Sequence, residues 1–131
     1  MPGKKVTYVS LEGDEALHRT YEKALGDVAG ELGSCHPILI GGREVFTGEQ
    51  FEVRSPIDRD ILVGTFLKGG GKEARDAFRA AREAFPDWSL RSWKERTAII
   101  RKTADRLEED RYLLAALITL EVGKNRFEAV A

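Results

Sequence analysis

Ala77-Phe-Arg-Ala-Ala-Arg-Glu-Ala-Phe-Pro-Asp-Trp88 is the central part of the clearest helical pattern in this sequence, which begins at Lys72. Apolar residues recur there every three or four positions, so they share one face of a helix, and charged residues occupy the opposite face. Pro86 has no backbone N–H and disfavours helical geometry in the residue before it, so we expect the helix to end near Ala84 or Phe85. The apolar face consists of Ala74, Ala77, Phe78, Ala81, Phe85 and Trp88.

A second long helix follows, and Ser92 and Glu95 mark its start. They fit a capping box, in which the serine hydroxyl accepts the N–H of the third helical residue and the glutamate accepts the N–H of the cap. A charged stretch predicts a bend or break near Asp110, Gly123 predicts a helix stop, and residues 125–131 open a further helical pattern. The apolar positions of the second long helix are Ile99, Ile100, Ala104, Leu107, Leu113, Leu114, Leu117, Ile118 and Leu120.

The two long helices are joined by a short connection, and each carries an apolar stripe that needs a partner. We therefore expect the two stripes to pack together. The predicted contact places Phe78, Ala81 and Phe85 against Ile100, Ala104 and Leu107.

Two β-hairpins are predicted upstream, within residues 36–67. In the first, Gly41-Gly42 interrupts an apolar and β-branched run, and this pair can supply the positive φ angles of a tight turn. In the second, an alternating segment around Phe51 and Val53 and a strand over residues 61–66 flank the turn residues 55–60.

The first segment, residues 1–35, is expected to contain an amphipathic helix from Leu11 to Leu32, with Gly33 as its stop. Its apolar positions are Leu11, Ala16, Leu17, Tyr21, Ala24, Leu25, Val28 and Leu32. Residues 36–67 then carry the short hairpins and residues 70–131 the long helices, and together they form one segment over residues 1–131.

Composition excludes several classes of function. With 21 Lys and Arg against 22 Asp and Glu, the net charge of -1 gives no basic footprint for nucleic acid. No apolar run approaches the ~20 residues of a membrane span, and no hydrophobic region follows the first basic residues. The single cysteine, Cys35, cannot form an internal disulfide and suits a reducing compartment, so the expected location is cytoplasmic.

Five features could carry chemistry, and each has a simpler structural interpretation. They are the Cys35-His36 pair, His18, the Gly69-Gly70-Gly71-Lys72 loop, the Glu108-Glu109-Asp110 carboxylates, and Arg91, Arg96 and Arg101. Neighbours on an extended chain point to opposite faces, so Cys35 and His36 suit packing. His18 lacks a second ligand at helical spacing and is expected to be solvated, and the glycine loop lacks the spacing of a phosphate-binding motif. We expect the charged groups to be solvated helix faces, and we assign no catalytic, cofactor-binding or metal-binding residue.

From Ile38 to Ala131 the sequence resembles the start of the aldehyde dehydrogenase superfamily. The matching stretches, in the family's order, are Ile40-Gly-Gly-Arg-Glu44, Ser55-Pro-Ile-Asp-Arg-Asp-Ile-Leu-Val-Gly64, Ala77 to Trp88, Glu95-Arg96 with Ala104-Asp-Arg-Leu-Glu108, and Leu120-Glu-Val-Gly-Lys124. Within the superfamily the 1-pyrroline-5-carboxylate dehydrogenases are most similar, because they also carry a leading helix. Two further matches to them are Pro37-Ile-Leu-Ile-Gly-Gly-Arg-Glu-Val-Phe-Thr47 and Val53-Arg-Ser-Pro-Ile-Asp58.

This resemblance implies an α/β fold segment: a leading helix, short antiparallel strands, and long helices of the cofactor-binding domain. It implies an enzyme that oxidises glutamate semialdehyde, the open form of 1-pyrroline-5-carboxylate, to glutamate in proline catabolism, with NAD or NADP as hydride acceptor. The family uses a cysteine nucleophile, an oxyanion site, a glutamate base and a glycine motif for the cofactor, all of which lie beyond the matched positions. We therefore expect this chain alone to be inactive and to bind no cofactor.

The partner expected from the resemblance is the remainder of a dehydrogenase chain, which would cover the apolar face carrying Phe78, Leu107, Leu114 and Leu117. Self-association through that face is the other expectation, because large uncovered apolar patches are unusual on soluble monomers. Two alternatives stay open: a small non-catalytic interaction module on the same scaffold, and an open reading frame that has been cut short.

Overall fold

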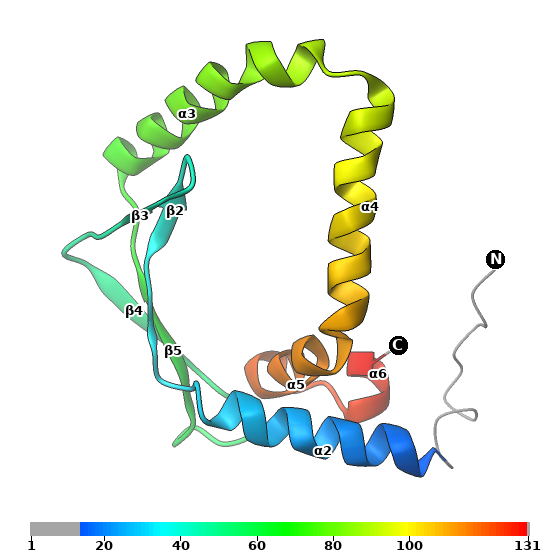
Figure 1. Cartoon of the computed structure of the whole chain (residues 1–131). Coiled ribbons are helices and arrows are strands. Elements are labelled where there is room, and N and C mark those ends of the chain that lie inside the picture. Colours follow the sequence, from blue (N-terminus) through cyan, green and yellow to red (C-terminus); the bar gives the residue numbers. More distant parts are fainter. Residues whose placement is uncertain (1–13, 131) are drawn as a thin grey trace.

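The computed structural model describes residues 14–130, and Figure 1 shows them as an open arch of mixed helices and strands. At the foot of the arch, α2 lies beside α5 and α6, while α3 forms its top and α4 its right-hand side. The helices are α2 (Glu15–Ala29), α3 (Gly71–Leu90), α4 (Trp93–Glu109), α5 (Arg111–Val122) and α6 (Arg126–Val130). The strands are β1 (Cys35–His36), β2 (Ile38–Ile40), β3 (Arg43–Val45), β4 (Gln50–Arg54) and β5 (Leu62–Leu67).

The buried core lies between α2 and the last two helices. Leucine, tyrosine, alanine and valine at steps of four, three and four place one stripe of α2 against the wholly buried Ala115 and Ala116 of α5. Val130 of α6 closes the same cluster. The α2 stripe consists of Leu17, Tyr21, Ala24 and Val28, all buried.

The amphipathic leading helix is thus confirmed, although its predicted bounds were too wide. Leu11 lies outside the described residues. The Asp14 carboxylate accepts the N–H of Leu17 at 3.0 Å and caps the start of α2. The helix ends at Ala29, three residues before the predicted end, and a turn leads to Gly33 at φ 80°. Ala16 was predicted to lie on the core face of this helix, but it is exposed.

Both predicted hairpins form. β2 and β3 pair antiparallel around Gly41 and Gly42, whose φ angles of 58° and 76° lie in the left-handed region that favours glycine. β4 and β5 pair antiparallel, with an irregularity between Val53 and Arg54. The sequence did not reveal that β1 joins β5 in parallel, which gives a three-stranded sheet in the order β1-β5-β4.

The predicted end of the first long helix was wrong, because α3 continues through Pro86 to Leu90. A proline removes the one hydrogen bond that its own N–H would donate, and here that loss falls near the helix end. The Ser89 hydroxyl donates to the Pro86 carbonyl at 2.9 Å within this last turn. Trp88 is therefore still helical, and 39% of its surface is exposed.

The capping box at the start of α4 is confirmed. Ser92 N donates to the Glu95 carboxylate at 2.8 Å, and the Ser92 hydroxyl accepts from Glu95 N at 3.3 Å. The predicted break is also confirmed, because Asp110 ends α4 and precedes α5. Gly123 closes α5 in the left-handed conformation, at φ 76°, and α6 follows.

The predicted packing of the first long helix on the second was wrong. Arg91 and Ser92 are both extended, with ψ angles of 141° and 153°, and they turn α4 away from α3, down the right-hand side of the arch (Figure 1). Along residues 71–109, all of which the structure describes, no side chain is buried. The exposed fraction is 66% for Phe78, 64% for Ile100 and 54% for Leu107.

Candidate functional site

Cys35 and His36 do not form a nucleophile and base. They are neighbours on the two-residue strand β1, where the Cys35 thiol is exposed. The His36 ring stacks on Phe66 of β5, with the ring centres 4.8 Å apart. A base must lie within hydrogen-bond reach of its thiol, and this imidazole is engaged in packing instead. The packing expected for this pair is therefore seen for His36, whereas the Cys35 thiol is exposed.

His18 is not the solvated side chain that the sequence suggested. Its Nδ1 lies 2.6 Å from Nη1 of Arg126 in α6, and the ring meets Phe127 edge-on at 5.8 Å. Arg126 also pairs with Glu22 and lies over the Tyr21 ring, 4.7 Å from its centre. These contacts hold α6 against α2, although Arg126 and His18 are more than one hundred residues apart in the sequence. The helical spacing around His18 therefore could not predict them.

The glycine loop before α3 is a helix start that the side chain of Glu73 caps. The Glu73 carboxylate accepts the N–H of Gly70 at 2.8 Å, and this bond together with the backbone N–H of Glu73 lowers the pKa of the carboxyl. Lys72 pairs with Asp76 at 2.9 Å, and that hydrogen bond raises the pKa of the lysine. The chain's own carboxylate therefore lies at this helix N-terminus, where a bound anion would otherwise lie.

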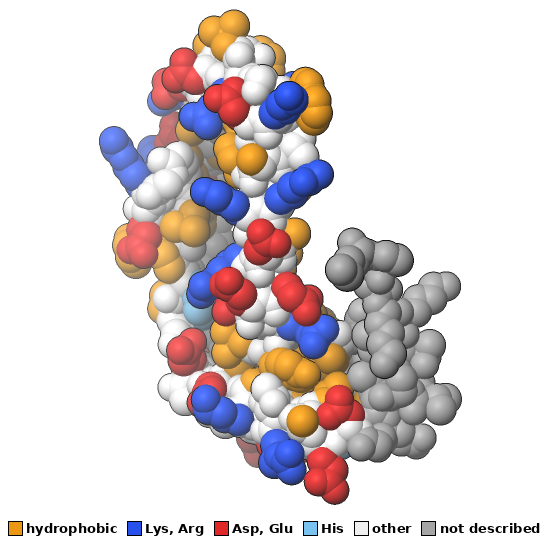
Figure 2. All heavy atoms as spheres, turned by 45° about the vertical axis from the view of Figure 1, so that its right-hand side comes forward, with side chains coloured by type: hydrophobic (Ala, Val, Ile, Leu, Met, Phe, Trp, Pro, Cys, Tyr) orange, Lys and Arg blue, Asp and Glu red, His pale blue; other side chains and the backbone are white. Residues whose placement is uncertain are grey.

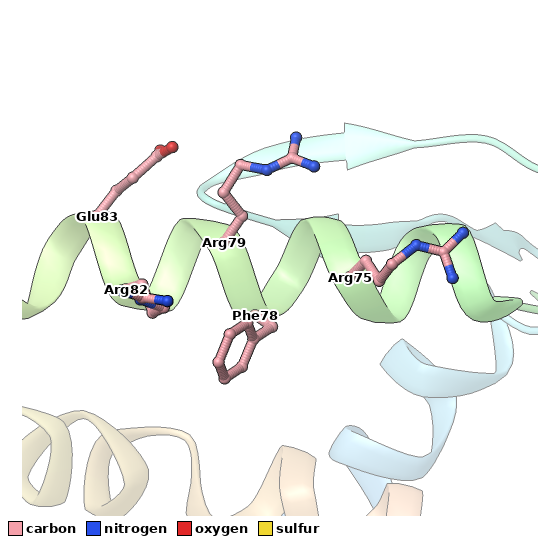
Figure 3. Close-up of a pocket in the computed structure, with 5 residues that line it drawn as sticks. All are labelled: Arg75, Phe78, Arg79, Arg82 and Glu83. Carbon is pink, nitrogen blue, oxygen red and sulfur yellow. The ribbon is translucent and has the colours of Figure 1, made fainter.

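A 530 Å³ hollow on α3 is lined by Arg75, Phe78, Arg79, Arg82 and Glu83. The close-up in Figure 3 shows that these side chains diverge: Arg79 and Glu83 rise from one side of the helix, and Phe78 points away from the other. Binding of an anion by arginine needs guanidinium groups that converge on one point. This hollow is therefore the open flank of an amphipathic helix.

Of the remaining charged candidates, Glu108, Glu109 and Asp110 form surface ion pairs, while Arg91 and Arg101 are exposed and Arg96 is half-buried. Arg106 lies 2.8 Å from Asp110 and 3.2 Å from Glu109, while Arg111 lies 3.1 Å from Glu108. In Figure 2, where α4 comes forward, Lys, Arg, Asp and Glu side chains occupy much of the visible face. Within residues 14–130 no group of His, Cys, Asp and Glu is arranged to hold a metal ion. None of the described helices is both long and apolar enough to cross a membrane.

The feature that stands out is apolar surface. On α3, Phe78 and Phe85 lie seven residues apart on one face, with exposed fractions of 66% and 64%. On α4, Trp93, Ile100 and Leu107 repeat the same spacing, with exposed fractions of 67%, 64% and 54%. We call these five side chains the arch stripes. The sequence predicted the apolar periodicity of all of them except Trp93. It placed Phe78, Phe85, Ile100 and Leu107 in a contact between the two helices, which was wrong, but it also expected the face with Phe78 and Leu107 to need a further partner.

Comparison with known proteins identifies the class that this arrangement belongs to. The model of the aldehyde dehydrogenase family matches residues 45–131, so the chain belongs to the aldehyde dehydrogenase family. Its curated relatives include 1-pyrroline-5-carboxylate dehydrogenases. The protein of that name from Bacillus pumilus is 35% identical over 117 residues, which are 89% of this chain and 23% of the relative. The one from Staphylococcus aureus is 30% identical over 110 residues.

Comparison with solved structures also finds 1-pyrroline-5-carboxylate dehydrogenases. The chain matches a Thermus 1-pyrroline-5-carboxylate dehydrogenase with bound NAD at a TM-score of 0.89 and 32% identity, over 99% of this chain and 25% of that one. It matches the Mycobacterium tuberculosis enzyme bound with NAD and cobalamin at a TM-score of 0.83 and 26% identity. The predicted family and fold are confirmed. The chain spans about a quarter of the length of the relatives it matches.

Proposed function

We propose that these residues form the N-terminal quarter of a dehydrogenase that oxidises glutamate semialdehyde, the open form of 1-pyrroline-5-carboxylate, to glutamate in proline catabolism. The observation that carries this proposal is the match over 99% of the chain, at a TM-score of 0.89, to a dehydrogenase of that name. NAD is the proposed hydride acceptor, because two of the matched structures contain it. A lone exposed cysteine suits a cytoplasmic location.

In this proposal the chain contributes scaffold to the reaction. Aldehyde oxidation through a thiohemiacetal needs a thiolate, a donor for the oxyanion, a base for the water and a surface that holds the nicotinamide. Cys35 is exposed on β1, and its neighbour His36 packs on Phe66. The 131-residue chain alone therefore should not reduce NAD or NADP with any aldehyde.

A chimera tests the function. The 131 residues would replace the matching quarter of the Bacillus pumilus relative, and formation of NADH from glutamate semialdehyde would be followed by absorbance. We expect turnover comparable to that of the unmodified relative, and the same turnover in the Cys35→Ser chimera. A folded chimera that oxidises other aldehydes but not this one would reassign the substrate.

The isolated chain is the second half of the test. Reduction of NAD by the isolated chain, lost in its Cys35→Ser variant, would overturn the scaffold role. A chain that melts sharply as a monomer and binds no hydrophobic dye would favour the alternative of a small, non-catalytic interaction module.

A further inference from the structure

His18 contacts α6 in a way that depends on the protonation state of its ring. Its Nδ1 lies 2.6 Å from Nη1 of Arg126. A guanidinium group donates hydrogen bonds, accepts none and is not deprotonated in proteins, so the histidine nitrogen must be the acceptor. The ring is therefore neutral, with its hydrogen on Nε2. Phe127 meets the same ring edge-on, with the ring centres 5.8 Å apart.

Three contacts hold Arg126 beside this imidazole. Besides the contact with His18, its Nη2 pairs with Glu22 of α2 and its guanidinium lies 4.7 Å from the centre of the Tyr21 ring. Only 26% of its side-chain surface is exposed. Protonation of His18 would remove the acceptor and place a second positive charge next to the guanidinium. The two charges would repel, and water screens that repulsion less for half-buried groups than for exposed ones.

The carboxylates nearest to His18 along α2 are already paired. Glu22, one turn after His18, pairs with Arg126, and Glu15, about one turn before it, pairs with Arg19 at 3.4 Å. Neither carboxylate is free to offset the added charge without giving up its present partner. The other charged or titratable side chains at the cap of α2 and on α5 and α6, none of which hydrogen-bonds His18 within the described residues, are Asp14, Arg111, Tyr112, Glu121 and Glu128.

We propose that His18 is a proton-sensitive switch: its neutral ring holds Arg126, and with it α6, and a proton taken from solvent onto Nδ1 releases α6 from α2. The ring is half-buried, so solvent reaches it. The release is local, because the described core cluster that joins Ala24 and Val28 of α2 to Ala116 of α5 contains no residue of α6. The inference is independent of the proposed function, since it uses only contacts within the chain.

The linkage between protonation and docking sets the size of the effect. An ordinary imidazole takes up its proton at about pH 6.5. If His18 can bind a proton only when α6 is released, lowering the pH from 7.5 to 5.5 raises the equilibrium constant for release about tenfold. This range stays above the pH at which ordinary carboxyl groups titrate, so the change reports on the imidazole.

Hydrogen exchange followed by NMR tests the switch in the 131-residue chain. The probe is the Ala129 N–H, which donates to the Asn125 carbonyl at 3.0 Å. A helix of five residues has no stability of its own, so release of α6 exposes this N–H. Its protection, relative to the unstructured exchange rate at each pH, should fall about tenfold from pH 7.5 to 5.5. The internal control is the N–H of the buried Ala116 in α5, whose protection should change less than twofold.

His18→Asn and His36→Asn are the matched variants, because the chain has two histidines. The amide oxygen of asparagine can accept from Arg126 near the present position of Nδ1, but it takes up no proton in this range. His18→Asn should therefore keep the protection of Ala129 within twofold between the two pH values, and His36→Asn should keep the tenfold loss. The same pH dependence in the wild-type chain and in His18→Asn overturns the switch.

Nitrogen NMR of the imidazole rings tests the switch without any substitution, should the variants fail to fold. At pH 7.5 the His18 ring should carry its hydrogen on Nε2. Between pH 7.5 and 5.5, protonation of this ring should coincide with the loss of Ala129 protection. A ring that becomes protonated while Ala129 stays protected has turned to another partner such as Glu22, and this result overturns the switch.

Discussion

Replacement of Tyr21 by alanine should unfold most of the isolated chain. Tyr21 has 2% of its surface exposed and lies in the cluster that joins α2 to Ala115 and Val130. Its hydroxyl shares a hydrogen bond with Thr119 of α5, and Arg126 of α6 lies over its ring. One side chain thus contacts both helices that α2 packs on.

The magnitude follows from these contacts. Truncation of a buried aromatic side chain to alanine costs about 3–5 kcal/mol, because the cavity only partly collapses. Tyr21→Phe keeps the ring and removes only the hydrogen bond to Thr119, which is worth about 1 kcal/mol. Small domains unfold with about 5–15 kcal/mol, and this chain should lie at the low end because the arch stripes are not buried. Tyr21→Ala therefore removes most of the stability, and Tyr21→Phe removes a measurable part.

Urea denaturation followed by circular dichroism measures both effects. At about 2 kcal/mol per M of urea, Tyr21→Phe should lower the midpoint by roughly 0.5 M, and Tyr21→Ala should leave no folded baseline. Leu39→Ala is the control, because 72% of Leu39 is exposed on β2 and its loss should change stability by less than about 0.5 kcal/mol. A Tyr21→Ala protein with the midpoint of Leu39→Ala would refute the view that the contact of α2 with α5 and α6 is the core.

Three further predictions concern local structure and exposure. Gly123→Ala should destabilise more than Gly42→Ala in urea denaturation: both glycines have φ 76°, but the new Cβ meets Pro56 at 3.2 Å only at position 123. Hydrogen bonds from the Ser92 hydroxyl and N–H lower the pKa of Glu95 below its usual 4.5. The ionised Glu95 therefore stabilises the folded chain at pH above 4.5, and this contribution is lost as the pH falls through the lowered pKa. Removal of the hydroxyl in Ser92→Ala should raise the Glu95 pKa measured by NMR towards 4.5, and an unchanged pKa would contradict the capping geometry. The isolated chain should bind a hydrophobic dye, with binding reduced by Trp93→Asp more than by Ala98→Asp, because Trp93 belongs to the arch stripes.

The sequence was a reliable guide where a few adjacent residues set the geometry. The Ser92 and Glu95 box needs only the two side chains and the backbone between them, and it appears at the predicted positions. The Gly41-Gly42 turn and the Gly123 stop depend on backbone angles that glycine adopts freely. Such signals are local, so they persist whatever the rest of the fold does.

Where the partner is distant in sequence, the prediction failed. His18 was expected to be solvated, but Arg126 reaches it from the other end of the chain. β1 was missed because a strand of two residues has no periodicity, and only its pairing with β5 defines it.

The contrast between α2 and α3 shows what periodicity can and cannot say. Both helices were identified from an apolar stripe at helical spacing, and both stripes exist. In α2, Tyr21 and Val28 find small residues at Ala115 and Ala116, which let the two helix backbones approach closely, and the stripe becomes a core. In α3, Phe78 faces the open side of the arch, because the extended Arg91 and Ser92 turn α4 away from it. An apolar stripe therefore predicts that a helix packs against an apolar partner. The connection to the next element determines whether that partner lies within the same 131 residues.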